Sequence, residues 1–364
     1  MTDLGTNPRR LRGIALATVA ALAVAVCGGA ATTPAPSAAP TTGPASAAPS
    51  GDATAAPMDP LADVCAKGAE EGKLIHWHNH SEEFVKAVEA FNEVYPDIEV
   101  ELLELSPDEA SQRILTEVAA GRTPSADLLA GGIDIFKPLF DREAIATDID
   151  WASYGVAEDL VKQGVVRIHR IAIGLGFNTK LTAAELPNTW EELIDAKWEG
   201  RVIVDPRGRP FDSLALAWGE EKALDYVQRL KDIVKPLVIE GGTAGLVAVA
   251  GGEADITTGG RSAETLEQQA EGAPVDIKYL DVVTTIDNYK TVLKGAAHPN
   301  AAICFTAWFA QDGQEIYNEI EFKSNETVPN GAPAGAEIVT IETPDQAGTV
   351  KDIGKKIAQI FSGG

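Results

Sequence analysis

The sequence predicts an α/β protein with two domains. Runs that are typical of strands alternate with amphipathic helical runs, and this order favours parallel sheets with right-handed crossovers. The chain has 364 residues, which is enough for two domains of ordinary size. Its 45% hydrophobic and 23% charged residues are typical of a globular protein and not of a disordered one.

The chain is strongly acidic, with a formal net charge of −24. The first 26 residues carry three arginines and one aspartate, so that a chain lacking them has a net charge of −26. Such a charge repels nucleic acids and anionic lipid headgroups, and we expect neither as a partner. We expect the protein to be a monomer.

Residues 1–26 have the pattern of a secretory signal peptide. Arg9, Arg10 and Arg12 precede an uncharged, apolar run that is too short for a permanent membrane span. A cytoplasmic N-terminal helix is the alternative. The paired arginines also fit twin-arginine export, but the hydrophobic motif that normally follows them is poor, so we expect general secretion.

Cys27 follows the apolar run and resembles the cysteine of a bacterial lipobox, which becomes an acylated first residue. Val24 and Val26 depart from that pattern, and cleavage by ordinary signal peptidase a few residues later is the alternative. Residues 27–58 are mainly Ala, Pro, Ser, Thr and Gly, a composition with too little apolar bulk to fold. We expect a disordered tether to a lipid anchor, on the outer face of the cytoplasmic membrane or in the periplasm.

Folded structure is expected to begin near Asp59, in βαβαβ order. The expected elements are helices over residues 61–71, 83–95 and 108–120, and strands over residues 74–77, 98–102 and 127–130. Gly72 and Gly121 end two of the helices, and Gly131 and Gly132 make a turn after the third strand.

Three of the five histidines alternate along the first strand, so that in an extended chain they point to one face. These are His76, His78 and His80, and with Glu82 they are candidate metal ligands. No paired cysteine or carboxylate spacing completes a closed site, so we favour a strand role for His76 and a polar loop for the others. A metal-dependent enzyme is the functional alternative. The chain has no nucleophile motif, and we do not expect an enzyme.

Residues 165–180 are apolar and β-rich and predict a long strand. Gly174 and Gly176 are not a nucleotide fingerprint, because no third glycine and no helix follow. His169 and Arg170 are interpreted as ordinary strand residues that face solvent.

The stretch over residues 187–210 predicts a short helix, a strand and a charged loop. Thr189 and Glu192 have the spacing of a capping box at the start of the helix. Residues 202–204 form a β-branched strand, and the loop after it carries Arg207 and Arg209. Ligands bind at this end of strands in α/β sheets, so the loop is a candidate binding site.

The rest of the chain predicts further helices and a returning strand. Helical structure is expected over residues 211–233, near 245–252, over 300–309 and over 339–361, and the returning strand over 286–293. The helix over residues 339–361 is polar enough to lie on the surface. His298 stands at a helix start and is expected to be structural.

Several motifs occur in a fixed order along residues 73–319. They are GRTPSADLL at 121–129, FNT at 177–179, WEELIDAKWEGRV at 190–202, AGGEADI at 250–256 and KGAAHP at 294–299. In this order they resemble family 1 extracellular solute-binding proteins of ABC importers, in the ferric-binding-protein-like branch. The resemblance implies a type II periplasmic-binding-protein-like fold, in which each of two lobes is a sheet flanked by helices and crossing strands join the lobes.

The resemblance also implies a division of the chain and a set of partners. Lobe 1 is expected over residues 59–172 and 288–320, lobe 2 over 173–287, and a C-terminal segment packing on the lobes over 321–364. The expected partners are a small-molecule solute and the permease and ATPase subunits of an importer. A lipid-anchored sensor or adhesion protein that binds a solute without transport is an alternative.

The resemblance further places three groups of residues at a cleft between the lobes. The lobe 1 group is His78, Asn79, His80, Ser81, Gly131 and Gly132. The lobe 2 groups are Arg207, Gly208 and Arg209, and Arg261 and Ser262. The His-Glu pair common in ferric members would fall at Ser81 and Glu82. Their adjacent tyrosine ligands are replaced here by the run at residues 260–263.

The cleft residues favour an anionic solute. Arg207, Arg209 and Arg261 offer guanidinium groups for a carboxylate or a phosphate, and an organophosphate, phosphonate or carboxylate is the expected ligand class. Surface ion pairs with Asp and Glu are the alternative role of these arginines. Ferric iron held with a synergistic anion is the alternative ligand, carried as cargo, and no resident cofactor is expected.

Two cysteines remain in the part of the chain that is expected to fold. In an exported protein an even pair suggests a disulfide, here between Cys65 and Cys304. Two buried thiols are the alternative.

Overall fold

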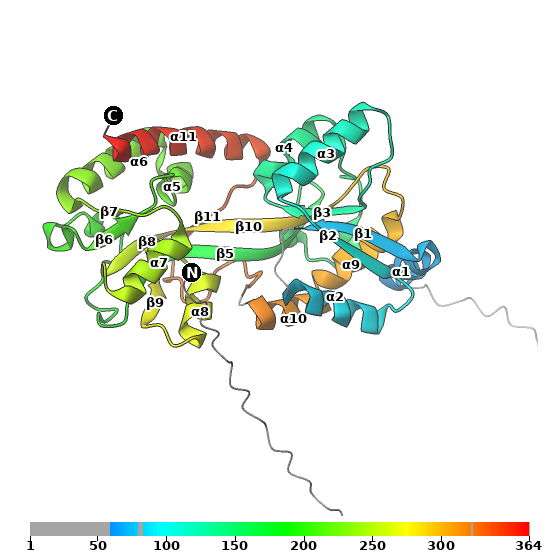
Figure 1. Cartoon of the computed structure of the whole chain (residues 1–364), viewed down its shortest axis with the longest axis horizontal. Helices are drawn as coiled ribbons and strands as arrows, with labels where there is room; N and C mark the ends of the chain where they lie inside the picture. The colour runs from blue at the N-terminus through cyan, green and yellow to red at the C-terminus, as the bar shows by residue number, and fades with distance from the viewer. Residues whose placement is uncertain (1–58, 79–82, 322, 364) are drawn as a thin grey trace, which may run out of the picture. The chain divides into compact units, whose positions relative to one another are not determined.

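The structure, a computed structural model, describes residues 59–78, 83–321 and 323–363. Among them, eleven strands form one sheet in the order β2-β1-β3-β10-β5-β8-β6-β7, with β11, β4 and β9 paired to the central strands. The two central strands, β5 (Val165–Asn178) and β10 (Val282–Val292), are antiparallel. Figure 1 shows them running between two groups of helices. The prediction of an α/β fold with two lobes joined by crossing strands is confirmed.

Lobe 1 contains the first half of the described chain, and its strands β2, β1 and β3 are parallel. Its elements are α1 (Pro60–Glu71), β1 (Lys73–His78), α2 (Glu83–Val94), β2 (Glu99–Glu104), α3 (Pro107–Ala119), β3 (Leu128–Gly131), α4 (Ile133–Asp141), two short 3-10 helices (Trp151–Tyr154 and Glu158–Leu160) and β4 (Val161–Lys162). The predicted βαβαβ order is confirmed, with ends that differ by one or two residues.

Local capping explains where the first helices begin and end. The side chain of Asp59 accepts a hydrogen bond from the Leu61 amide at the start of α1, and Gly72 ends the helix with a left-handed conformation (φ 74°). Ser106 and Glu109 form a capping box at the start of α3.

Helix α4 was not predicted, because Gly131 and Gly132 were interpreted as a turn. In the structure Gly131 is the last residue of β3 and Gly132 is the N-cap of α4. The cap has no side chain to signal a helix start, and Pro138 lies inside the helix, so two ordinary sequence signals point the other way. This short connection places the first turn of α4 directly beyond the carboxyl end of β3.

Lobe 2 is built around β6, which pairs in parallel with β7 and β8. Its elements are β6 (Val202–Val204), α5 (Phe211–Trp218), α6 (Glu220–Arg229), a π-helical turn (Leu230–Val234), β7 (Leu237–Val238), α7 (Gly242–Gly251), β8 (Ile256–Arg261), α8 (Ser262–Ala270) and β9 (Val275–Lys278).

The helix predicted to begin at Thr189 is wrong. The Thr189 hydroxyl does accept a hydrogen bond from the Glu192 amide, but only two 3-10 turns follow, at Glu191–Leu193 and Ala196–Trp198. The buried indole of Trp190 donates to the carbonyl of Val282 in β10. This tertiary anchor and the new turn that starts at Asp195 override the local helix signal.

The chain then returns to lobe 1 and ends on a helix that contacts both lobes. These last elements are α9 (Pro299–Phe309), α10 (Asp312–Glu321), β11 (Glu337–Val339) and α11 (Pro344–Ser362). Helix α11 contacts α4 in lobe 1 and α5 and α6 in lobe 2 (Figure 1). The helix predicted over residues 339–361 starts later than expected, after a capping box formed by Thr343 and Gln346. It was expected to lie on the surface, but one of its faces is buried through Ile353 and Ile357.

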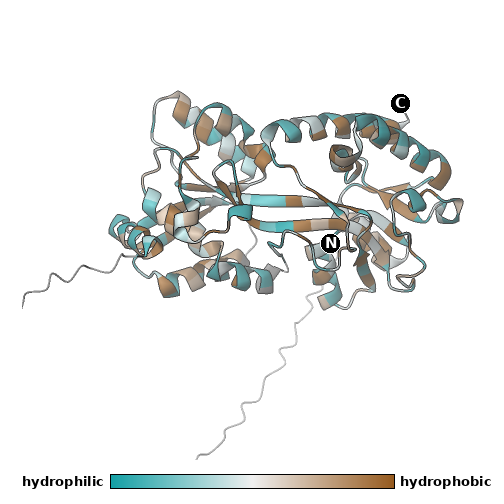
Figure 2. Ribbon diagram, turned by 180° about the vertical axis from the view of Figure 1, so that it is seen from behind, coloured by the Kyte–Doolittle hydropathy of each residue, from teal (hydrophilic) through white to brown (hydrophobic). Residues whose placement is uncertain are grey.

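Each lobe has its own apolar core. Aromatic side chains of α2 and α9 fill lobe 1, and Trp190, Trp198 and Phe211 fill lobe 2. Figure 2 shows hydrophilic stretches on the two crossing strands between these cores.

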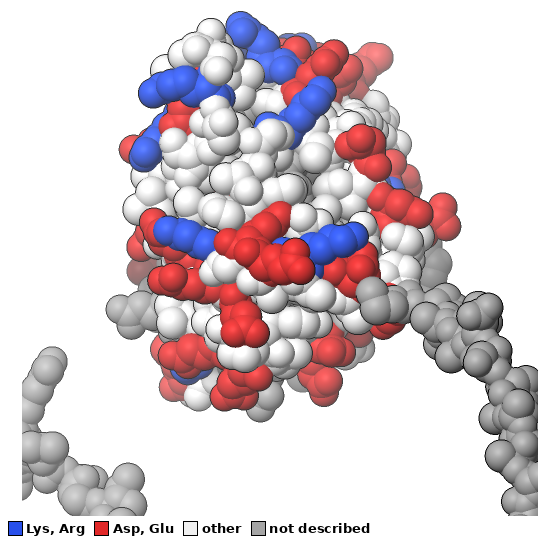
Figure 3. All heavy atoms as spheres, turned by 90° about the vertical axis from the view of Figure 1, so that its right-hand side faces the viewer, with Lys and Arg blue, Asp and Glu red and all other residues white. Residues whose placement is uncertain are grey.

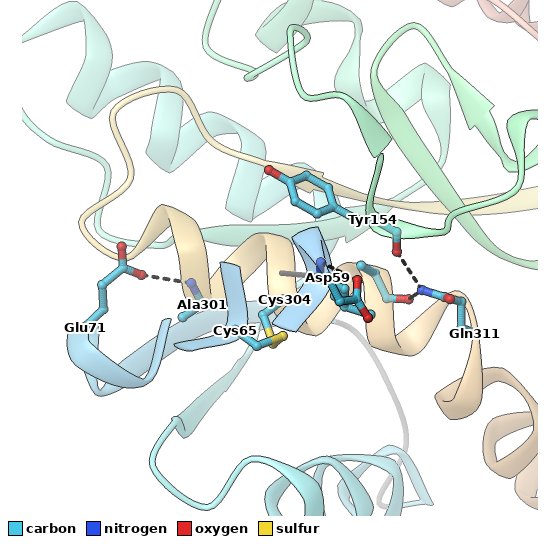
Figure 4. Close-up of a disulfide and its surroundings, with 9 residues drawn as sticks. Asp59, Cys65, Glu71, Tyr154, Ala301, Cys304 and Gln311 are labelled. Carbon is cyan, nitrogen blue, oxygen red and sulfur yellow. Dashed lines mark hydrogen bonds between the residues drawn. A yellow bond between two sulfur atoms is a disulfide. The ribbon is translucent and has the colours of Figure 1, made fainter. Parts of the chain in front are cut away.

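A disulfide joins Cys65 in α1 to Cys304 in α9, across 239 residues of sequence (Figure 4). Glu71 strengthens the same helix contact, because its carboxylate accepts a hydrogen bond from the Ala301 amide (2.8 Å). The first helix is therefore held covalently and by hydrogen bonding to a helix made much later in the chain.

The predictions for residues 1–26, for Cys27 and for the tether at 27–58 lie outside the described residues. Within the described part of the chain, no helix is both long and apolar enough to cross a bilayer. The lobe boundaries drawn from the sequence stay a prediction.

Candidate functional site

A small pocket lies where the two lobes and the crossing strands meet. It has a volume of about 60 Å³. Its lining comes from lobe 1 (Gly132, Ile133, Asp134), from lobe 2 (Arg209, Ser213), from the crossing strands (Ile173, Thr285, Ile286, Asp287) and from Ile341 before α11. The structure therefore brings the predicted Gly132 and Arg209 together in one pocket.

The lobe 1 side of the pocket is the start of α4. Gly132 caps this helix and Asp134 is the acidic residue of its first turn. The Asp134 carboxylate turns back toward Gly132, so that a Cβ built on Gly132 would overlap its Oδ1 atom. Asp134 is exposed and lines the pocket, and the sequence analysis did not select it.

The lobe 2 side is the loop between β6 and α5, which Asp205 organises. Its carboxylate accepts hydrogen bonds from the backbone amide of Arg207 (2.9 Å), from Nη2 of the same residue (2.7 Å) and from the Gly241 amide (3.2 Å). Burial alone raises the pKa of Asp205, but the Arg207 hydrogen bonds outweigh it and the pKa lies below its ordinary value. Gly208, with φ 100°, packs its backbone against Gly354 of α11.

The three predicted arginines have different surroundings. Arg207 pairs with Asp205, and Nη1 of Arg261 lies 2.9 Å from Oε1 of Glu264. Arg209 is exposed and makes no hydrogen bond or ion pair within the described residues. Arg209 is therefore the arginine at the pocket whose guanidinium forms no hydrogen bond within the described residues, although its positive charge acts against the rise that burial causes in the pKa of Asp212.

Arg207 and Arg261 nevertheless flank one feature, the N-terminus of α7. A Cβ built on Gly241 would lie 3.9 Å from Nη2 of Arg207, and one on Gly242 would lie 3.2 Å from Nε of Arg261. Because Asp205 and Glu264 already pair with these arginines, both guanidinium groups are expected to bind an anionic ligand more weakly.

Ser262, predicted as a ligand residue, holds strands together in this structure. Its hydroxyl accepts a hydrogen bond from the Ala172 amide in β5 (3.1 Å). Ser262 also forms a hydrogen bond with Tyr279. Burial raises the pKa of Tyr279 to about 12, although the hydrogen bond with Ser262 acts to lower it. The Tyr279 phenol is therefore protonated at neutral pH.

The candidate metal ligands on β1 lie in the core of lobe 1, away from the pocket. His76 is fully buried with Nε2 3.3 Å from Nζ of Lys290, and its ring stacks on His78. Burial and the nearby Lys290 lower the pKa of His78 to about 4. Asn79, His80, Ser81 and Glu82 lie outside the described residues. The described residues contain no group of three His, Cys, Asp or Glu side chains that could hold a metal.

Two residues expected to face solvent are buried, and this prediction is wrong. His169 and Arg170 are each only 5% exposed. Arg170 donates to both carboxylate oxygens of Asp287, its partner across β10, and to the Thr327 carbonyl (2.8 Å). Charged residues in otherwise apolar strands were the sequence signal for this buried network, and it was overlooked.

A larger hollow of about 550 Å³ lies between α3 and α4 on the outside of lobe 1. It contains none of the residues predicted to bind a ligand, and its lining comes from one lobe alone. Figure 3 shows the lobe 1 end of the molecule, where acidic side chains form a band and the Lys and Arg side chains gather mainly above it. We therefore regard the smaller pocket, which both lobes line, as the candidate site.

Two lobes, two long crossing strands and a pocket lined from both lobes define a solute-binding protein of the two-lobed class. A family model described as "Bacterial extracellular solute-binding protein" matches residues 77–316. The chain belongs to this family. The description of this family assigns its members to the binding of solutes outside the cell, and not to catalysis.

Comparisons with individual proteins agree with this assignment. The chain is 28% identical over 236 residues to "Iron uptake protein A1" of Synechocystis, matching 54% of this chain and 62% of that protein's length.

Two solved structures share the fold. The Trichodesmium protein IdiA (FutA), in complex with iron and citrate ligands, has a TM-score of 0.61 at 17% identity, covering 80% of this chain and 98% of that one. The periplasmic binding protein AfuA of Actinobacillus pleuropneumoniae, with exogenous fructose-6-phosphate bound, has a TM-score of 0.56 at 18% identity, covering 79% and 97%.

Proposed function

We propose that this chain captures ferric iron together with a small anion and presents them to the permease of an ABC importer. The observation that carries the anion is the guanidinium of Arg209, which forms no hydrogen bond within the described residues, at a pocket lined by both lobes. The iron is supported by similarity to a protein named for iron uptake and by the fold shared with an iron- and citrate-bound structure.

The local chemistry supports iron in a complex and not as a bare ion. Residues 260–263, where the resembled ferric proteins place paired tyrosines, are Gly, Arg, Ser and Ala. Burial raises the pKa of Tyr279 to about 12 and also raises that of Tyr289 in β10, which disfavours the phenolate form that would bind a ferric ion. An accompanying anion would supply oxygen ligands to the ferric ion and accept hydrogen bonds from Arg209.

A metal-free anion is the second candidate. The same guanidinium suits an organophosphate, a phosphonate or a carboxylate, and the fold is shared with a protein that holds fructose-6-phosphate. In both cases the pocket of about 60 Å³ holds only a few water molecules, so the lobes must part to admit the solute and close over it.

Calorimetric titration of metal-free protein separates the two candidates. The probes are ferric citrate, citrate alone, fructose-6-phosphate and methylphosphonate, each followed by metal analysis after gel filtration. Iron retained in stoichiometric amount, with tighter binding of ferric citrate than of citrate, supports the proposal. Binding of a metal-free anion with no retained iron supports the second candidate and overturns the first.

We also propose that Cys27 is acylated and that residues 27–58 tether the binding domain to the membrane. The family's location outside the cytoplasm and the position of Cys27 after an apolar run support this. Mass spectrometry of the mature N-terminus tests it. A diacylglyceryl mass on Cys27 that is lost in Cys27→Ala is the expected result, and a mature chain that starts beyond residue 27 would contradict it.

A further inference from the structure

We propose that Asp134 and Arg209 bind opposite ends of one ligand, Asp134 the cationic end and Arg209 the anionic end. The inference rests on the proposed function and names which residue faces the metal and which faces the anion. It also adds a lobe 1 ligand residue that the sequence analysis did not select.

The two side chains approach the pocket from different lobes. Asp134 stands on the first turn of α4, beyond the end of β3, and Arg209 stands in the loop after β6. Both are exposed, and within the described residues neither forms a hydrogen bond or an ion pair, although the charge of Arg209 also acts on the buried Asp212 of α5. They do not pair with each other, although both line one pocket. The site therefore offers a negative group on one wall and a positive group on the other.

Asp134 is the available carboxylate on this pocket. Asp287 also lines it, but its oxygens already accept hydrogen bonds from Arg170 (2.8 and 2.6 Å) and from the Thr340 hydroxyl (3.0 Å). Asp287 is thus neutralised by a buried partner, whereas the charge of Asp134 is not. A carboxylate oxygen is a suitable ligand for a hard, highly charged cation.

The arrangement favours a ligand that carries both a positive and a negative group over a ligand that is only anionic or only cationic. A purely anionic solute gains hydrogen bonds from Arg209 but meets the negative charge of Asp134 in the same pocket. A ferric complex of an organic acid satisfies both walls, because the metal faces the carboxylate and a free oxygen of the acid faces the guanidinium. Since the walls belong to different lobes, such a ligand also favours the closed form.

Gly132 provides an independent handle on the position of Asp134. A side chain at residue 132 would start where Oδ1 of Asp134 now lies, and it would push the carboxylate away without removing its charge. Gly132→Ala thus moves the group, and Asp134→Asn neutralises it in place.

The test measures calorimetric binding of ferric citrate and of citrate alone to the full mature chain. The variants are Asp134→Asn, Gly132→Ala and Arg209→Gln. The controls are Glu143→Gln and Arg122→Gln, which change exposed charges of lobe 1 outside the pocket. Thermal unfolding of each variant checks that it is folded.

The proposal predicts that Asp134→Asn changes the affinities for ferric citrate and for citrate in different ways. Asp134→Asn should weaken ferric citrate by about tenfold or more and should leave citrate alone equal or tighter, because a repelling charge is gone. Gly132→Ala should weaken the binding of ferric citrate but not that of citrate. Arg209→Gln should weaken the binding of both ligands. The controls should change neither.

Two failures are distinguishable. If the wild-type chain retains no iron from any ferric salt, the proposed function is wrong, and this assignment falls with it. If the wild-type chain binds ferric citrate and Asp134→Asn weakens both ligands equally or neither, the function stands and the role of Asp134 is overturned.

Discussion

The guanidinium group of Arg170 grips the carboxylate of Asp287 across the two strands that connect the lobes. Nε lies 2.8 Å from Oδ1 and Nη2 lies 2.6 Å from Oδ2. Both side chains are buried, with exposures of 4% and 3%. The pair joins β5 to β10, and a hydrogen bond from Arg170 to the Thr327 carbonyl adds the segment after α10.

Removing one member of this pair should destabilise the protein strongly. Arg170→Met leaves the buried Asp287 carboxylate with the hydroxyls of Thr340 (3.0 Å) and Tyr289 (3.3 Å) and with one longer ion pair, to Arg167 (3.8 Å). We expect the free energy of unfolding in urea to fall by about 3 to 5 kcal/mol, the range found when a buried ion pair loses one partner. Lys67→Met, which removes an exposed ion pair in α1, serves as the control and should cost less than about 1 kcal/mol. If Arg170→Met and Lys67→Met lower the free energy of unfolding equally, burial does not make the pair between β5 and β10 more important than an exposed ion pair.

Replacing the buried amine of Lys290 should stabilise the protein. Lys290 is fully buried against Phe84, Phe305 and Phe309, and burial lowers its pKa well below the ordinary value. The unfolded chain therefore binds a proton that the native state excludes, and the stability contributed by this site rises with pH toward the unfolded-state pKa. Lys290→Met should raise the free energy of unfolding at pH 7 by about 1 to 4 kcal/mol.

The same variant should flatten the rise in stability between pH 7 and pH 10. Lys294→Met, at an exposed lysine just after β10, is the matched control and should change neither quantity. A loss of stability in Lys290→Met would mean that the contacts of the amine with the three rings and with Nε2 of His76 (3.3 Å) outweigh the cost of its burial.

Buried histidines should make the protein sensitive to mild acid. The pKa of His78 falls to about 4 and that of His169 lies well below its ordinary value, in both cases chiefly through burial. Between about pH 6.5 and 4 the unfolded chain binds more protons, so stability is lost as the pH falls through this window. Urea unfolding at pH 8, 6.5 and 5 measures the loss. His169→Gln should make it smaller, and an unchanged profile in that variant would contradict the buried, neutral state of His169.

Breaking the disulfide should destabilise the fold. The bond between Cys65 and Cys304 closes a sequence separation of 239 residues. A double Cys65→Ser and Cys304→Ser variant should lose about 2 to 5 kcal/mol of unfolding free energy. Alkylation of the denatured wild-type chain, with and without reductant, checks the bond directly. Two thiols that react without reductant would restore the alternative of free cysteines.

The three arginines should contribute unequally to anion binding. Arg209→Gln should weaken citrate by about tenfold or more, since its guanidinium forms no hydrogen bond or ion pair within the described chain. Arg207→Gln and Arg261→Gln should each change the affinity by about threefold or less, because Asp205 and Glu264 already hold them. Calorimetry gives the ranking, and a larger effect at Arg261 would move the anion toward the start of α7.

The sequence predicted those parts of the fold that local pattern determines. The three-residue strand at Val202–Val204 and the first helix, stopped by Gly72, appear where apolar pattern and turn chemistry place them. Thr189 shows the limit of such signals. Its capping contact forms, but the anchored indole of Trp190 turns the chain before a helix develops.

The sequence predicted where the candidate site lies better than it predicted which residues line it. The glycines after β3 and the loop after β6 meet at one pocket because both follow the carboxyl ends of strands. Asp134 and Asp287 were missed, because their roles depend on contacts across the lobes and across β5 and β10, which a single chain pattern does not encode. The burial of Arg170 has the same cause, since only its register opposite Asp287 explains it.

The interleaving of the lobes also sets the order in which the protein can mature during synthesis. Lobe 2 lies between β5 and β10 in the sequence, whereas lobe 1 lacks β10 and α9 until they have been made. Cys65 is consequently made long before its partner Cys304. Until β10 and α9 have been made, the early half of the molecule is an unfinished sheet with an unmatched thiol.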